Sequence, residues 1–150
     1  YQEALIRAGI DAEPGHGLCL GLSFHLAPTR EQAIREATPY FEEHIKMFAP
    51  LGFFRGLNDE QLAVVAAGGD WAAADIPTLA DACDAGTWYC GPPQGFVEFL
   101  ETLEERYPGL EAVNVQSSMG TPQAVMLEQL EWFARDVMSD MRRKEGAAAT

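Results

Sequence analysis

One stretch, from residue 110 to residue 138, constrains the fold most because it joins a strand, a glycine loop and a long helix. Its first residues, LEAVNVQ, follow a Pro-Gly turn and are rich in strand-forming types, so they predict a short buried strand. Gly120 ends the extended run, Thr121 is a typical helix cap, and Pro122 suits the first helical position. Apolar residues then recur at three- and four-residue steps, which predicts one apolar stripe on a helix: Met126, Leu130, Phe133, Val137 and Met141.

Two earlier stretches predict further strands. Residues 18–27 alternate large aliphatic side chains with small or polar ones, and both faces are largely uncharged, as in a strand that is covered on both sides. Residues 87–90 (TWYC) are a second candidate, and the Gly-Pro-Pro turn after them leads into an amphipathic helix. In a closed parallel barrel, the small and polar face of residues 18–27 would point to the barrel axis, where space is tight.

A long helix is predicted after the first strand. Thr29 and Gln32 form the pattern of a capping box, in which the hydroxyl and the amide each bond to a backbone N–H group. Pro39 lacks the N–H group that an interior helical residue donates, so it predicts a kink or a restart of the helix with Thr38 as a new cap.

The segment 50–86 is predicted to be a helical insertion. Caps at Asn58 and Thr78 would begin two short, alanine-rich helices, and we expect these to be thin surface elements that form a lid or an interface. The resulting order is strand, helical region, strand, helix, strand, helix, which predicts an α/β fold with parallel strands and right-handed crossovers. At 150 residues the chain is one domain rather than two.

Composition excludes several classes of function. A net charge of −13 argues against a nucleic-acid partner and against anionic membranes, and the apolar runs are too short to span a bilayer. Three cysteines, Cys19, Cys83 and Cys90, have no short paired spacing, which argues against a disulfide framework and against a metal site. We expect all three to be small core residues in a cytoplasmic protein.

Candidate site residues follow from the rule that parallel α/β folds bind ligands at the carboxyl ends of their strands. The rule selects residues 25–29, 90–93 and 116–121. His25 could donate to a cofactor or carry a proton, or it could be a core histidine bonded to the backbone. A polar strand face leading to the glycine loop could bind a polar ligand or an anion, or it could reflect ordinary loop capping: Asn114, Gln116 and Ser118.

Three segments of the sequence resemble the C-terminal part of luciferase-like, flavin-dependent monooxygenases. These are APTREQAIREATPYFEEHIKMFAPLGF (27–53), WYCGPP (88–93) and NVQSSMGTPQAVMLEQLEWFARDVM (114–138). The last segment is the most specific, although Ser139 stands where the family usually has a proline. The resemblance implies a C-terminal part of a (β/α)8 TIM barrel, with about three of its parallel strands and with residues 1–150 as a single partial domain. In a barrel wall these strands would be adjacent in chain order.

The resemblance also implies an oxidoreductase chemistry. Such flavoproteins use reduced flavin (FMN) and O2 to oxidise a small organic substrate, often with a partner flavin reductase, and they are commonly homo-oligomers. No catalytic residue is carried over, because the family's catalytic and flavin-phosphate positions lie mainly in earlier strands. By position, the cofactor-binding residues would be His25, Gln116, Ser117, Ser118 and Met119.

Two other functions stay open. Some relatives use the deazaflavin F420 for hydride transfer without oxygen, so an F420-dependent oxidoreductase of the same fold is one alternative. The other is a non-enzymatic protein-interaction module that docks through its acidic helices. Because a full barrel needs about 250 residues, we expect the isolated chain to be inactive and either to associate through open strand edges or to remain partly loose.

Overall fold

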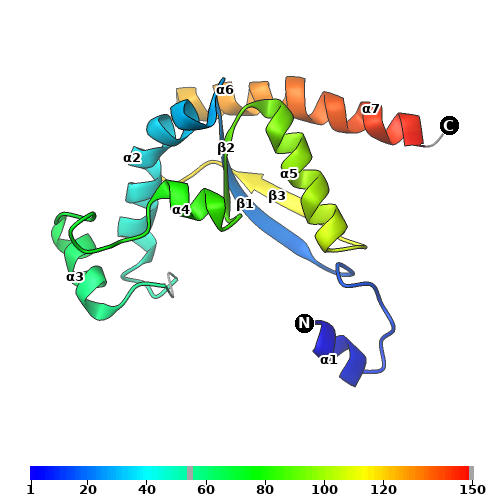
Figure 1. Cartoon of the computed structure of the whole chain (residues 1–150), viewed down its shortest axis with the longest axis horizontal. Helices are drawn as coiled ribbons and strands as arrows, with labels where there is room; N and C mark the ends of the chain where they lie inside the picture. The colour runs from blue at the N-terminus through cyan, green and yellow to red at the C-terminus, as the bar shows by residue number, and fades with distance from the viewer. Residues whose placement is uncertain (54–55, 149–150) are drawn as a thin grey trace.

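The computed structural model describes residues 1–53 and 56–148, and its three strands form one parallel sheet (Figure 1). The strands are β1 (Cys19–Leu26), β2 (Trp88–Gly91) and β3 (Ala112–Gln116), and they pair in the order β2-β1-β3. The predicted α/β fold class with three parallel strands is therefore confirmed.

The expectation that the strands are adjacent in chain order is wrong, because β1 lies between the other two. β2 pairs with the carboxyl half of β1, with partners from Ser23 to Leu26, and β3 pairs with the amino half, from Cys19 to Ser23. The two outer strands use opposite edges of β1, so the chain crosses over β1 between β2 and β3. A parallel sheet with this change of direction has a crevice outside the carboxyl ends of its strands, where such folds bind ligands.

Helices cover both faces of the sheet. Figure 1 shows α2, α3 and α4 on one side of the strands and α5 on the other, with α6 and α7 continuing as one long run. The run contains a short π-helical segment, η1. The helical elements are α1 (Gln2–Arg7), α2 (Arg30–Phe48), α3 (Asp59–Ala67), α4 (Leu79–Asp84), α5 (Pro93–Arg106), α6 (Gln123–Trp132), η1 (Phe133–Val137) and α7 (Met138–Ala148).

The alternation along β1 separates two hydrophobic cores. Its large residues pack with α5 and η1, in a cluster that includes Leu22, Phe24, Leu26, Phe96, Val97 and Val137. Its opposite face carries Ser23 and His25, both buried, and α2 packs over this side. The small, polar face is therefore covered by a helix and does not face an open barrel axis.

Most of the predicted helix starts are confirmed. The Thr29 hydroxyl accepts a hydrogen bond from the backbone N–H of Gln32 at 3.2 Å, but the Gln32 amide bonds to Glu36, so the predicted capping box at Thr29 is only half formed. Asn58 and Thr78 each form a complete capping box. The predicted restart at Thr38 is wrong, because α2 continues through Pro39. The Thr38 hydroxyl instead donates to the carbonyl oxygen of Ile34 at 2.7 Å.

The insertion 50–86 contributes to the core, which corrects the expectation of thin surface helices. Val65, Ile76 and Leu79 are buried in one cluster with residues of α2 and β2. Large aliphatic residues at a few positions are enough to dock these short, alanine-rich helices. The two residues at 54–55 lie outside the described part of the insertion.

Three smaller expectations are also wrong. β3 is an edge strand whose Ala112, Asn114 and Gln116 are exposed, so it is not buried. Helix α6 begins at Gln123, with Pro122 as its cap, and no side chain caps it. Cys19 is exposed, because it begins β1 outside the covered half of the sheet. Among the residues described, no helix is both long and apolar enough to cross a bilayer.

Candidate functional site at the carboxyl ends of β1 and β3

His25 lies at the carboxyl end of β1, in a cavity of about 450 Å³ between α2 and α6. Its side chain is 6% exposed, and its Nε2 lies 3.3 Å from Oε2 of Glu36, which is itself 43% exposed. Gln32 Nε2 donates to Oε1 of Glu36 at 2.8 Å. This hydrogen bond and the one from His25 hold the pKa of Glu36 below its usual value, against a smaller opposing effect of burial. The pair therefore connects a buried imidazole to a carboxylate that reaches solvent.

Gln129 of α6 lies in the same cavity and fixes the end of β1. Its side chain is 3% exposed. The amide oxygen accepts from the backbone N–H of Leu26 at 2.5 Å, and the amide nitrogen donates to the carbonyl oxygen of Leu26 at 3.1 Å. The pairing of β3 with β1 stops at Ser23, so Gln129 supplies the hydrogen bonds that a longer strand would have made.

The Gln116–Met119 segment lies at the carboxyl end of β3, where it lines a second cavity of about 400 Å³ with His44 and Phe48. Gln116 and Met119 are exposed, whereas Ser118 is buried and donates from its hydroxyl to the carbonyl oxygen of Tyr40 at 2.9 Å. The Tyr40 ring lies 6.3 Å from the His25 ring. The two sets of predicted site residues therefore lie on either side of Tyr40.

The linings of the two cavities disfavour an anion. Both combine apolar side chains with amide and hydroxyl groups, the first also contains the carboxylates of Glu36 and Glu128, and neither lining includes a lysine or an arginine. The aliphatic part of Glu43 lies close to Gly120 of the glycine loop, and its carboxylate pairs with Lys46 at 2.8 Å. These surroundings disfavour a phosphate at this place. Among the residues described, no group of three or more potential ligand side chains could hold a metal ion.

His44 gives the second cavity a testable dependence on pH. Its ring packs against Phe48, with 4.6 Å between ring centroids, and burial lowers its pKa from the usual 6.5 because the charged form is poorly solvated there. The unfolded chain therefore binds more protons than the folded chain as the pH falls through about 6.5, and the free energy of unfolding falls with it.

We expect His44→Gln to flatten this loss of stability between about pH 7.5 and pH 5.5. Urea unfolding at the two pH values, followed by circular dichroism, measures the difference in the free energy of unfolding. His16→Gln is the control, because that histidine is 60% exposed. An unchanged pH dependence in His44→Gln would show that another group is responsible.

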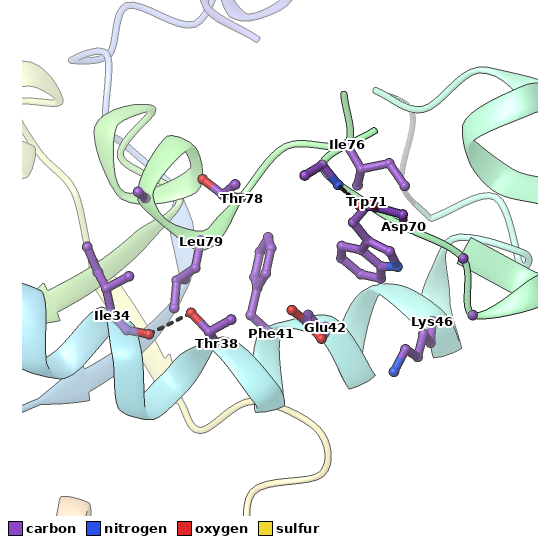
Figure 2. Close-up of a pocket in the computed structure, with 14 residues that line it drawn as sticks. Ile34, Thr38, Phe41, Glu42, Lys46, Asp70, Trp71, Ile76, Thr78 and Leu79 are labelled. Carbon is purple, nitrogen blue, oxygen red and sulfur yellow. Dashed lines mark hydrogen bonds between the residues drawn. The ribbon is translucent and has the colours of Figure 1, made fainter. Parts of the chain in front are cut away.

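A larger cavity lies between α2 and the insertion, away from the strand ends. Its volume is about 650 Å³, within the range of small-molecule sites. Figure 2 shows Phe41 and Glu42 rising from α2 towards Trp71 and Ile76, which come from the segment after α3. Asp70, at its edge, accepts hydrogen bonds from the backbone of Ala72 and Ala73. The aromatic and aliphatic walls suit an apolar molecule, and the lining contains neither histidine nor cysteine.

The residues that the sequence analysis selected at the strand ends lie in cavities, and their helical neighbours had been given no role. His25 lines the first cavity and the Gln116–Met119 segment lines the second, and a role in binding a cofactor stays a prediction for both. Glu36, Tyr40 and Gln129 lie on helices, and sequence reasoning gave them no role. Gln129 takes the buried position that the predicted apolar stripe gave to Leu130, which is 50% exposed, so that part of the stripe is wrong. The third predicted region, 90–93, lies in a separate cavity with α4 and α5.

Comparison with solved structures relates this fold to a flavin enzyme. The fold of this chain is similar to that of the oxygenating constituent of 3,6-diketocamphane monooxygenase from the CAM plasmid of Pseudomonas putida, a type II Baeyer–Villiger monooxygenase in complex with FMN. The TM-score is 0.53 and the sequence identity 20%, and the match covers 91% of this chain and 36% of that protein. No family model matches the sequence, and no curated protein matches it.

At this identity the likeness shows the fold alone. The chain is an α/β protein that resembles part of a TIM-barrel-type monooxygenase, and it spans 36% of the length of the protein it matches. The strand order β2-β1-β3 still differs from a barrel wall with successive strands side by side. The likeness by itself therefore assigns neither a flavin, nor a substrate, nor a catalytic role to this chain.

Proposed function

We propose that residues 1–150 form part of a flavin-dependent monooxygenase that uses reduced flavin and O2 to oxidise a small organic substrate. The observation that carries the proposal is the fit of 91% of this chain to an FMN-bound monooxygenase. Because the fit covers 36% of that protein, we assign the activity to a longer polypeptide that includes this chain. A flavin reductase partner and a homo-oligomeric enzyme are parts of the same proposal.

The strand-end cavities suit the ring system of a flavin better than its phosphate. Met119, Met126 and Phe48 offer apolar contact, and the amide of Gln116 and the hydroxyl of Ser117 offer hydrogen bonds to polar ring edges. The absence of lysine and arginine from both linings means that another part of the enzyme binds the phosphate. When bound, the flavin supplies the redox chemistry, and these residues bind and orient it and exclude water.

The test uses the polypeptide translated from the complete reading frame that contains residues 1–150. We expect it to bind FMN with a dissociation constant in the micromolar range or lower, and to consume O2 when reduced FMN is supplied. Parallel titrations with F420 distinguish the deazaflavin alternative. Residues 1–150 alone are the control, and we expect their flavin affinity to be at least about tenfold weaker, a difference of about 1.4 kcal/mol.

Two outcomes contradict the proposal. If neither FMN nor F420 binds to the complete polypeptide, the interaction-module alternative is favoured. If residues 1–150 alone bind FMN as tightly as the complete polypeptide does, the view that further strands are needed is wrong.

A pair of substitutions separates ligand binding from stability. Met119 is 42% exposed beside the second cavity, so Met119→Ala should weaken flavin binding to the complete polypeptide about five- to tenfold. It should change the free energy of unfolding by less than about 0.5 kcal/mol. Ser118→Ala should lower the free energy of unfolding by about 1 kcal/mol, because its hydrogen bond to Tyr40 is lost.

Fluorescence titration and urea unfolding measure the two effects separately. Leu127→Ala is the matched control, because Leu127 is an apolar residue of α6 that is 53% exposed and lines neither strand-end cavity. Flavin binding that is equal in Met119→Ala and Leu127→Ala would remove the Met119 region from the site.

A further inference from the structure

Two of the three cysteines lie together, although they are on different elements. Cys83 is in the last turn of α4 and Cys90 is in β2, yet both line one cavity, and Cys83 packs against the hydrophobic cluster that contains Cys90. The chain returns directly from α4 into β2, with the backbone N–H of Thr87 donating to the carbonyl oxygen of Ala82 at 3.0 Å. This short connection keeps the two cysteines close together at the edge of the insertion.

The two thiols differ in exposure. Cys83 is half-buried and Cys90 is buried, and both line a cavity of about 290 Å³. A small oxidant can therefore reach Cys83 first, while Cys90 lies behind it. Cys19 is exposed at the start of β1 and belongs to neither α4 nor β2, so it serves as an internal reference thiol.

The surroundings of the pair shift the pKa values of the two thiols in opposite directions. Interaction with the Cys90 thiol lowers the pKa of Cys83, burial opposes this shift, and the positive charge of Arg30 supports it while the carboxylate of Asp84 opposes it. Arg30 is held in place by its ion pair with Asp84, at 2.5 Å between Nη2 and Oδ1. The neighbouring Cys83 and burial raise the pKa of Cys90, so Cys83 is the more acidic thiol of the two.

We propose that Cys83 and Cys90 form a peroxide-reactive dithiol that closes to a disulfide between α4 and β2. The Cys83 thiolate attacks one oxygen of hydrogen peroxide, the O–O bond breaks, and Cys83 becomes a sulfenic acid while hydroxide leaves. The Cys90 thiol then attacks the Cys83 sulfur, the S–S bond forms, and water leaves with the Cys90 proton. The two sulfur atoms are oxidised by two electrons in total, and the peroxide is reduced.

The disulfide would fix the insertion to the sheet. Thr78, Leu79 and Ala80 of the α4 region line the larger cavity between α2 and the insertion, so the bond would restrain one wall of that cavity. The inference is independent of the flavin proposal, since it rests on the two thiols and Arg30 alone.

The experiment treats the full chain with hydrogen peroxide near neutral pH and maps the cysteines by peptide mass spectrometry without reduction. We expect an intramolecular Cys83–Cys90 disulfide, with Cys19 still reduced, and Cys83 reacting about tenfold or more faster than Cys19. Dithiothreitol should restore all three thiols. In Cys90→Ser, a dimedone adduct should accumulate on Cys83, and in Cys83→Ser neither the adduct nor the disulfide should form.

Arg30→Gln should slow the oxidation of Cys83 without changing that of Cys19. The proposal is overturned if peroxide oxidises Cys19 first while Cys83 and Cys90 stay reduced. It is equally overturned if disulfides form only between chains. The order of cysteine oxidation and the type of disulfide are both measured on the unsubstituted chain. A variant that fails to fold therefore does not affect either result.

Discussion

Replacing Phe96 with alanine is expected to lower the free energy of unfolding by about 3–5 kcal/mol. Phe96 is 0% exposed and is a central residue of the core between the sheet and α5. Its ring stacks on Tyr89 with 4.6 Å between centroids, and it lies 5.4 Å from Phe24 and 5.8 Å from Phe133. One side chain of α5 thus joins β1, β2 and η1, and its removal leaves a cavity that none of these elements can easily fill.

Urea unfolding followed by circular dichroism measures the loss. Phe99→Ala is the matched control on the same helix, because Phe99 is only half-buried and should cost less than Phe96→Ala. Phe96→Leu keeps part of the volume, so it reports on the site even if the alanine variant does not fold. A loss below about 1 kcal/mol for Phe96→Ala would mean that the core around α5 collapses around the gap, contrary to the close ring packing in the structure.

Local signals in the sequence predicted most element boundaries, because short-range chemistry determines them. The capping pattern at Asn58 fixed the start of α3, and Gly68, with φ of +65°, ended it. Thr78 did the same for α4. Such caps depend on residues three positions apart, which the sequence displays directly.

The strand order could not be predicted, because it depends on contacts between distant residues. The sequence of β3 shows that it is a strand but does not show whether it pairs with β1 or with β2. In the structure, Val113 and Val115 pack into the core beside α5 and η1, and this packing favours the place next to β1. The same edge position leaves Asn114 and Gln116 exposed to solvent. Their polar side chains, which suggested a bound polar ligand, are therefore explained in part by exposure to water.

The candidate site was predicted only in part, because contacts between distant residues bring its helical members to the strand ends. A general rule about parallel sheets located His25 and the Gln116–Met119 segment at the carboxyl ends, and both line cavities there. The rule does not describe the helices that pack over these ends. The hydrogen-bond partner of His25 and the acceptor for Ser118 come from Glu36 and Tyr40 of α2, whose positions follow from packing.

The second large effect is expected at Gln129, which makes both hydrogen bonds to the backbone of Leu26. Gln129→Met keeps the length of the side chain but leaves a buried N–H and a buried carbonyl group without partners. Each such group costs about 1–3 kcal/mol, so we expect the free energy of unfolding to fall by about 2–5 kcal/mol. Because Leu26 ends β1 beside His25, the same variant should also loosen the first cavity.

Gln129→Glu distinguishes the loss of hydrogen bonds from a simple loss of packing. At neutral pH the carboxylate can accept from the N–H of Leu26, but it cannot donate to the carbonyl oxygen, and its buried charge is costly. The protonated acid can do both, so acidification should raise the stability of Gln129→Glu relative to the unsubstituted chain. Gln123→Glu, on an exposed position of α6, should change the unfolding free energy by less than about 0.5 kcal/mol.

Unfolding measured at about pH 7 and pH 5 decides between the two explanations. If Gln129→Glu is equally destabilised at both pH values, shape rather than hydrogen bonding explains the effect. If Gln129→Met is as stable as the unsubstituted chain, the carboxyl end of β1 is held by its pairing with β2 alone. Recovery of Gln129→Glu at the lower pH would instead show that a helix side chain takes the place of a neighbouring strand at Leu26. The position of His25 at the first cavity would then depend on α6 as well as on the sheet.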